Sequence, residues 1–247
     1  MDSHATHVTR VCAVIGDGRL GRTLAAALRA AGRAVDGPLA RGADGTGAGV
    51  ALLCVPDGEI AAAAAAVTPR DGLLVGHCSG ATGLEPLAPH EGFSLHPLMT
   101  VTTRGADLRG AAAAVDGATP RALAAAEDLA VALGMRPVRV AAADRAAYHA
   151  AASIASNFLV TLEAAAERLA ASAGIDREAL VPLVRATVAN WAEQGPGRAL
   201  TGPVARGDEA TVERQRAAIA ERAPDLLGLF DALARATRAL AGREVAA

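Results

Sequence analysis

The sequence predicts an α/β fold with a mainly parallel sheet, followed by a smaller all-α domain. Short apolar runs alternate with helical patterns, glycine-rich turns separate them, and no strand pattern follows residue 141. We therefore expect a sheet domain at residues 1–141 and a helical domain at 142–247. The chain has 247 residues, 52% of them hydrophobic, which is enough for a buried core.

The strands are expected in continuous apolar runs, which are typical of parallel strands covered on both faces. They lie in segments 10–15, 34–40, 49–57, 72–80, 92–100, 111–117 and 135–141. Helices are expected at 22–32, 58–67 and 120–134, and then at 144–175, 177–194, 212–223 and 225–242. Segment 42–49, "GADGTGAG", is too short and too glycine-rich for the crossover helix expected there, so this edge of the sheet is shortened.

Composition excludes several classes of function. The net charge of -2 gives no basic surface for nucleic acid, and no apolar run is long enough to cross a membrane. The N-terminal "MDSHATHVTR" lacks the apolar region of a signal peptide, so we interpret it as a disordered lead-in to a cytoplasmic protein. The three cysteines have no paired spacing and predict no metal site. All 24 basic residues are arginine, which excludes any mechanism that needs a catalytic lysine.

The segment "GDGRLG", Gly16 to Gly21, follows the first strand and opens the first helix. In that context it fits the dinucleotide-binding pattern of a Rossmann-type fold. Gly16 would make the tight turn, Gly18 would let the backbone approach a pyrophosphate, and Gly21 would let helix and strand pack closely. Arg19 and Leu20 complete the turn, whose free N–H groups favour an anion.

The choice between NAD and NADP depends on the end of the second strand, where an acid binds the ribose or an arginine binds the 2′-phosphate. Asp36 has the usual spacing from Gly16 but falls in mid-strand, whereas Arg41 falls at the strand end. Arg41, with Arg19 beside the turn, favours NADP, and NAD remains the alternative.

Ser79 and His96 stand at the ends of the fourth and fifth strands, in "GHCSG" and "LHPL". Ligands of open α/β sheets bind outside the carboxyl ends of the strands, so both residues are candidates for the reaction site. Alternatively, Ser79 is a helix cap and His96 a structural histidine. Pro97 restricts His96 to extended geometry.

The segment "YHAAASIASNFLV" places His149, Ser153 and Asn157 four residues apart, along one stripe of a helix. A further set occurs in "ALTGPVARGDEAT", where Thr201, Arg206 and Asp208 lie in a loop between helices. Arg206 would hold a substrate carboxylate, or Asp208 would simply cap the next helix and pair with Arg206.

Six segments of the chain together resemble a family of two-domain bacterial proteins. They are "GDGRLGRTLA", "VPDGEI", "HCSGA", "LHPLMT", "YHAAASIASNFLV" and "ALTGPVARGD". That family joins a Rossmann-like oxidoreductase domain to a helical C-terminal domain of unknown function. It is similar to the 6-phosphogluconate-dehydrogenase-like superfamily, which includes ketopantoate reductase, pyrroline-5-carboxylate reductase and prephenate dehydrogenase. The resemblance implies a homodimer formed through the helical domain, and cofactor contacts that include Val55 and Pro56 of "VPDGEI". It also implies a small substrate, with ketopantoate as the candidate.

The resemblance bears on the active site in two ways. Ketopantoate reductases carry a lysine four residues before an asparagine; Ser153 and Asn157 keep that spacing, but the lysine is absent here. Prephenate dehydrogenases resemble this chain at Ser79, His96 and His149.

We expect NADPH-dependent reduction of a small 2-oxo acid, with His96 as proton donor because histidine titrates near neutral pH. His149, Ser153 and Asn157 would face His96 from the helical domain across a cleft, and Ser79 would orient the carbonyl. The alternatives are a dehydrogenase of a prephenate-like hydroxy acid and a non-catalytic dinucleotide-binding protein.

Overall fold

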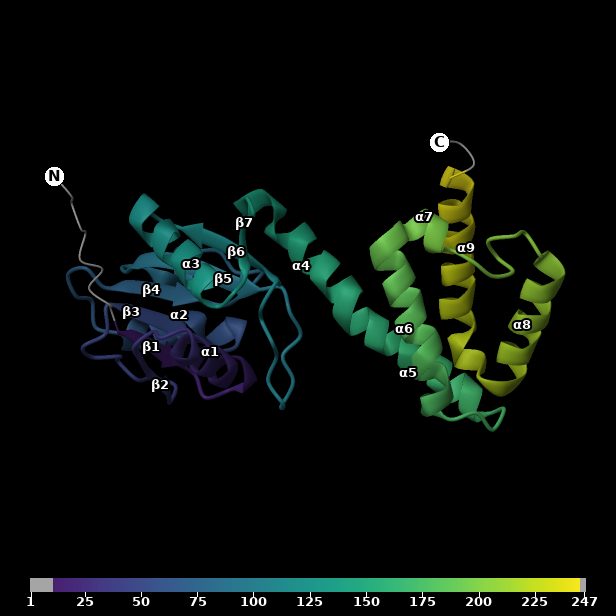
Figure 1. Cartoon of the computed structure of the whole chain (residues 1–247), viewed down its shortest axis with the longest axis horizontal. Helices are drawn as coiled ribbons and strands as arrows, with labels where there is room; N and C mark the ends of the chain where they lie inside the picture. The colour runs from purple at the N-terminus through teal and green to yellow at the C-terminus, as the bar shows by residue number, and fades with distance from the viewer. Residues whose placement is uncertain (1–10, 245–247) are drawn as a thin grey trace. The chain divides into compact units, whose positions relative to one another are not determined.

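The computed structural model describes residues 11–244 (Figure 1). The predicted lead-in at residues 1–10 lies outside the described part. The chain divides into two compact units, residues 1–156 and 157–247. The first unit holds the sheet and also helix α4 (Arg145–Ser153).

Seven strands of the described chain form one sheet in the order β2-β1-β3-β4-β5-β6-β7. All neighbouring strands are parallel except β5 and β6, which pair antiparallel. The strands are β1 (Cys12–Ile15), β2 (Val35–Leu39), β3 (Val50–Leu53), β4 (Leu74–His77), β5 (Glu91–Pro97), β6 (Ala112–Gly117) and β7 (Arg136–Arg139). This arrangement confirms the predicted mainly parallel sheet.

Helices cover both faces of the sheet, because the strands are apolar on both faces. On one face, α1 (Arg19–Ala30) and α3 (Pro120–Ala132) pack with side chains such as Val14, Leu52 and Leu95. On the other face, α2 (Ile60–Ala66) packs with side chains such as Ile15 and Leu53. The core is aliphatic, and Phe93 is its largest fully buried side chain.

Residues 42–49 form turns and no helix, as their glycine content predicts. Asp44 fastens this connection to the segment after α2 by accepting hydrogen bonds from the Thr68 N–H and the Arg70 guanidinium. The short connection leaves β2 as an edge strand.

The second unit is helical within the described residues. Its helices are α5 (Leu159–Ala171), α6 (Arg177–Gln194), α7 (Pro196–Ala199), α8 (Glu209–Arg222) and α9 (Leu227–Glu244). Ion pairs join neighbouring helices: Arg177 to Glu167, Arg216 to Asp231 and Arg238 to Glu209. Within residues 11–244, no helix has both the length and the hydropathy needed to cross a membrane.

Candidate dinucleotide and reaction site

The turn after β1 has room for glycine alone at two of its three glycine positions. Gly16 has φ +119°, and a Cβ atom there would lie 2.3 Å from the carbonyl oxygen of Cys54. A Cβ atom at Gly21 would lie 1.9 Å from the carbonyl oxygen of Gly16. These contacts set α1 tightly against β1 and β3, as the tight turn and close packing of this motif require.

Gly18 differs from both, because no atom lies within 4 Å of a Cβ atom built on it. It is exposed and forms the N-cap of α1, where no side chain caps the first N–H groups of the helix. Arg19 is exposed beside it, whereas Leu20 packs partly against the core. An exposed helix N-terminus with no acidic residue in its first turn suits a phosphate group.

Arg41 follows the end of β2, and its partner is an acid from another segment. Asp36 lies within β2 and is exposed, whereas Arg41 follows the strand. The Arg41 guanidinium donates a hydrogen bond of 2.7 Å to the carboxylate of Glu59, and both side chains are largely exposed. Val55 and Pro56 follow β3, which is separated from β2 by β1. The Arg41–Glu59 pair could not be predicted from the sequence, because its members are far apart in the chain.

Ser79 is bound entirely to protein groups. Its hydroxyl donates to Asp57 Oδ2 at 2.8 Å and accepts from the N–H groups of Thr82 at 3.0 Å and Ala81 at 3.2 Å. The side-chain oxygens of Ser79 and Thr82 are 2.9 Å apart. The Ser79 side chain thus holds the turn after β4, where no helix begins, so Ser79 is not the helix cap of the alternative interpretation.

His77 holds the same turn through two hydrogen bonds of its imidazole ring. Its Nδ1 accepts from the N–H of Ser79 at 3.1 Å, and its Nε2 donates to the carbonyl oxygen of Gly83 at 2.8 Å. The imidazole is fully buried, and burial lowers its pKa below the ordinary value. A neutral ring with one donor and one acceptor matches these two contacts.

His96 lies at the end of β5, where its ring packs on Gly80. A Cβ atom at Gly80 would come within 2.8 Å of His96 Cε1, so glycine is needed for this contact. Nδ1 of His96 is 2.8 Å from the hydroxyl oxygen of Tyr148, and the two rings meet edge to face. The centroid of the His149 ring lies 6.2 Å from that of His96. The structure therefore brings together two of the predicted residues, His96 and His149, and adds Tyr148.

The pKa of His96 differs from the value near neutrality that a histidine proton donor requires. Burial lowers it to about 4, and the charge of neighbouring His149 acts in the same direction. At neutral pH the ring is therefore uncharged, because its surroundings disfavour a second proton. The expectation of a neutral-range pKa was wrong, since sequence alone does not show how deeply the ring is buried.

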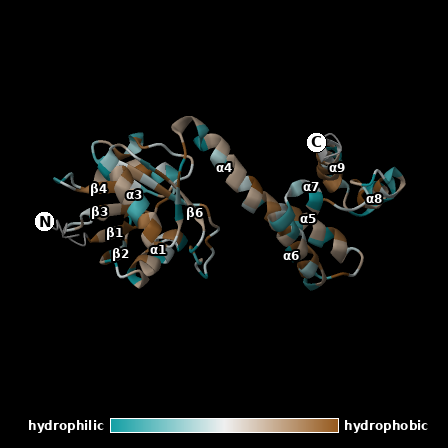
Figure 2. Ribbon diagram, turned by 45° about the horizontal axis from the view of Figure 1, so that its top comes forward, coloured by the Kyte–Doolittle hydropathy of each residue, from teal (hydrophilic) through white to brown (hydrophobic). Residues whose placement is uncertain are grey.

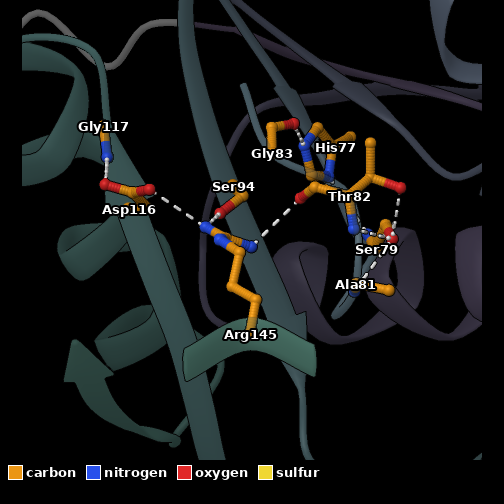
Figure 3. A network of polar contacts seen from close by, with 9 residues as sticks. All are labelled: His77, Ser79, Ala81, Thr82, Gly83, Ser94, Asp116, Gly117 and Arg145. Atoms are coloured by element: carbon orange, nitrogen blue, oxygen red, sulfur yellow. Dashed lines mark hydrogen bonds and ion pairs between the residues drawn. The ribbon is translucent and has the colours of Figure 1, made fainter. Parts of the chain in front are cut away.

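Arg145 anchors the start of α4 to the sheet (Figure 3). Its guanidinium donates to Ser94 Oγ at 2.8 Å, to Asp116 Oδ2 at 3.0 Å and to the carbonyl oxygen of Thr82 at 3.1 Å. Only 6% of the residue is exposed. Charge-assisted hydrogen bonds of this kind fix direction as well as position, so the first turn of α4 is held against β5 and β6.

Ser153 ends α4, and a π-helical turn, Ile154–Phe158, follows it. Asn157 lies inside this turn and belongs to the second unit. In an α-helix a step of four residues overshoots one turn, whereas in the wider π turn it falls short of one. The predicted stripe of His149, Ser153 and Asn157 therefore crosses a change of helix geometry and the boundary between the two units, and it stays a prediction.

The loop before α8 places Asp208 as the cap of that helix. Its carboxylate accepts from the N–H of Thr211 at 3.1 Å, and this bond holds its pKa below the ordinary value. Thr201 and Arg206 are exposed in the same loop. The capping role of Asp208 matches one of the two interpretations of the sequence, and a substrate role for Arg206 stays a prediction.

The C-terminal half of the chain matches a family model described as a domain of unknown function, DUF2520. The match spans residues 111–237, just over half of the chain. The chain belongs to the DUF2520 family. The matched region begins at β6 and includes α4 with Arg145, Tyr148 and His149, whereas the glycine turn after β1 lies outside it.

Solved structures resemble this DUF2520 chain over almost its whole length. A candidate NADP oxidoreductase from Bacteroides fragilis has a TM-score of 0.79 at 20% identity, covering 93% of this chain and 98% of its own. Protein TM1727 from Thermotoga maritima has a TM-score of 0.73 at 25% identity, covering 95% and 99%. A reductive aminase from Aspergillus terreus, solved with NADPH and ethyl-5-oxohexanoate, has a TM-score of 0.66 at 17% identity, covering 93% and 95%. No protein with curated annotation matches the sequence.

Sequence reasoning missed several residues of this site: Asp57, Gly80, Ser94, Asp116, Arg145 and Tyr148. Tyr148 is the only tyrosine of the chain and directly precedes His149, which was a usable signal. The others act through contacts between segments far apart in the sequence. No group of three or more His, Cys, Asp or Glu within residues 11–244 is arranged to hold a metal ion.

Proposed function

We propose that this protein is an NADPH-dependent oxidoreductase that reduces the carbonyl group of a small 2-oxo acid, with a ketopantoate-like substrate as the candidate. One observation carries the proposal. The strands β1, β4 and β5 are parallel members of one sheet, and at the same edge they end in the glycine turn, Ser79 and His96. Ligands of such sheets bind outside this edge. The candidate NADP oxidoreductase and the NADPH-bound aminase with the same fold support this reading.

The residues after β1 fit a dinucleotide. Gly18 leaves its backbone open to a pyrophosphate, and the N–H groups that begin α1 would hold it. Arg41 would hold a 2′-phosphate, for which Glu59 now competes as its ion-pair partner. NADPH, when bound, supplies the hydride that reduces the carbonyl carbon. His96, on its strand end, would contact the carbonyl oxygen and take part in its protonation.

The test has two stages. Titration calorimetry with NADPH and NADH should show binding with NADPH preferred. NADPH oxidation with a panel of 2-oxo acids should then find a substrate, and NADP reduction with prephenate should give no turnover. Absence of binding for both dinucleotides at millimolar concentration would refute the proposal. Binding without turnover on either panel would favour the non-catalytic alternative, to which the short connection at residues 42–49 also points.

We also propose a homodimer formed through the second unit. Its buried side chains among the described residues are few: Val212, Ile219, Ala223 and Ala234. Large apolar side chains are exposed instead, among them Val160 at 69%, Leu183 at 65% and Trp191 at 58%. Figure 2 shows hydrophobic residues spread along the helices of this unit. Exposed apolar surface of this kind is typical of an oligomer interface.

A further inference from the structure

The half-buried side chain of Tyr148 is held in position by the anchoring of its own helix. It lies three residues after Arg145, on the same face of α4, and Arg145 is fixed by its three bonds to Ser94, Asp116 and Thr82. The Tyr148 hydroxyl thereby reaches Nδ1 of His96 at 2.8 Å. All of these residues belong to the first unit, so the contact does not depend on the second.

The two ring nitrogens of His96 lie in different environments. Nδ1 is bonded to Tyr148, whereas Nε2 has no hydrogen-bond partner among the described residues. An uncharged imidazole that accepts at Nδ1 carries its proton at Nε2. In that tautomer, with the Tyr148 hydroxyl donating to Nδ1, His96 presents one N–H from the end of β5.

Charged and titratable groups surround this pair from several elements. His149 and Arg145 act from α4, His77 from β4, and Asp57 from the segment before α2. The combined effect of burial, His149, Arg145 and His77 outweighs that of Asp57, so a doubly protonated His96 ring is disfavoured. Burial raises the pKa of Tyr148, and the Arg145 charge opposes that rise.

We propose that Tyr148 is the source of the proton, which it delivers through His96. The inference rests on the proposed carbonyl reduction. As hydride adds to the carbonyl carbon, the C–O π pair moves to oxygen, and that oxygen takes the proton from His96 Nε2. Nδ1 takes the phenol proton of Tyr148 in the same step. The products are the alcohol, a neutral imidazole in its other tautomer, and a tyrosinate.

This relay fits the surroundings better than direct donation by a charged histidine. The ring stays neutral throughout, and the negative charge ends on an oxygen near the Arg145 guanidinium. An alkoxide is a far stronger base than a phenolate, so the transfer is downhill. Tyr148 is only partly buried, so solvent restores its proton after each turnover.

The single tyrosine allows a direct test on the full chain. Ultraviolet absorbance of tyrosinate, measured against pH, reports Tyr148 alone. The rate of carbonyl reduction, measured over the same range, should fall on the alkaline side with the same midpoint, because ionisation removes the donated proton. Asp116→Asn removes the carboxylate that pairs with Arg145, so both midpoints should shift downward together. His90→Gln, a histidine elsewhere in the unit, should move neither.

Tyr148→Phe keeps the ring that packs on His96 and removes only the hydroxyl. We expect kcat to fall by about 10²-fold or more, with NADPH affinity and the unfolding midpoint nearly unchanged. A rate that instead declines as the pH rises from 4 to 7 would make imidazolium the donor and overturn the relay. Turnover retained in Tyr148→Phe would overturn it as well. If neither panel gives turnover in the wild-type protein, the proposed function itself fails, and the relay fails with it.

Discussion

Replacing Gly18 by alanine should separate dinucleotide binding from folding. Its backbone, at φ -82° and ψ -177°, is open to alanine, and no atom lies within 4 Å of the added methyl group. Alanine is a poorer N-cap than glycine, which costs about 0.5–1 kcal/mol. A bound pyrophosphate, by contrast, would have to approach this same backbone. We expect NADPH affinity to fall by roughly 10- to 100-fold, about 1.4–2.8 kcal/mol.

Gly21→Ala provides the comparison, because its methyl group would lie 1.9 Å from the carbonyl oxygen of Gly16. The turn or α1 must move, and overpacking of this kind costs about 1–3 kcal/mol of stability. This variant should lose both binding and stability. Gly228→Ala, in an open position on α9, is the control and should bind NADPH like the wild type while gaining up to about 1 kcal/mol.

Titration calorimetry gives the affinity, and urea unfolding gives the stability, for all three variants. The decisive result is how the loss of NADPH affinity in Gly18→Ala compares with its loss of unfolding free energy. If that variant binds NADPH as tightly as the wild type, no pyrophosphate lies against Gly18, and the cofactor assignment of the turn is wrong.

Three further predictions concern the cofactor, the pH and the assembly. Arg41→Ala should reduce NADPH affinity by about tenfold relative to NADH, whereas Glu59→Gln, which frees Arg41, should increase it. If calorimetry shows neither change, the 2′-phosphate does not bind at the end of β2. Because the pKa of His96 is lowered to about 4 in the folded protein, the unfolded chain takes up this proton first as the pH falls. The contribution of the neutral His96 ring to the free energy of unfolding is therefore complete above about pH 6.5 and is lost as the pH falls towards 4. His96→Gln should therefore lose less stability than the wild type across that window in urea unfolding, and parallel curves would contradict the shift. Light scattering at micromolar protein should give a dimer, and a charged residue at Leu183 together with one at Trp191 should give a monomer; a monomeric wild type would refute the interface.

The sequence predicted the features that depend on local pattern. Alternating apolar runs and helical patterns gave the sheet and its helices, because burial on two faces requires continuous apolar strands. The spacing of Gly16 and Gly21, in a turn between a strand and a helix, predicts their packing tasks, and the structure shows the contacts that require them. The cap formed by Asp208 follows from the same local rules.

The sequence did not predict what depends on contacts between distant segments. Arg145 meets Ser94 and Asp116 because α4 returns to the antiparallel pair β5 and β6. That docking also buries His96 and sets its pKa, so the chemistry of the imidazole followed from tertiary structure and could not be inferred from residue type. The ion pair of Arg41 with Glu59 is of the same kind.

The absence of lysine gives a chemical reason for the proposed relay, in which several side chains share one task. A lysine ammonium can supply both a positive charge beside a developing alkoxide and a proton to neutralise it. Arginine supplies the charge but does not give up a proton at the pH of the cell. A chain with arginine as its only strong base must therefore separate the two roles. In this structure the Arg145 cation lies beside a phenol and an imidazole that hold transferable protons. Exchange of Arg145 for lysine should accordingly disturb the anchoring of α4, because one ammonium cannot reproduce three bonds made from a planar guanidinium.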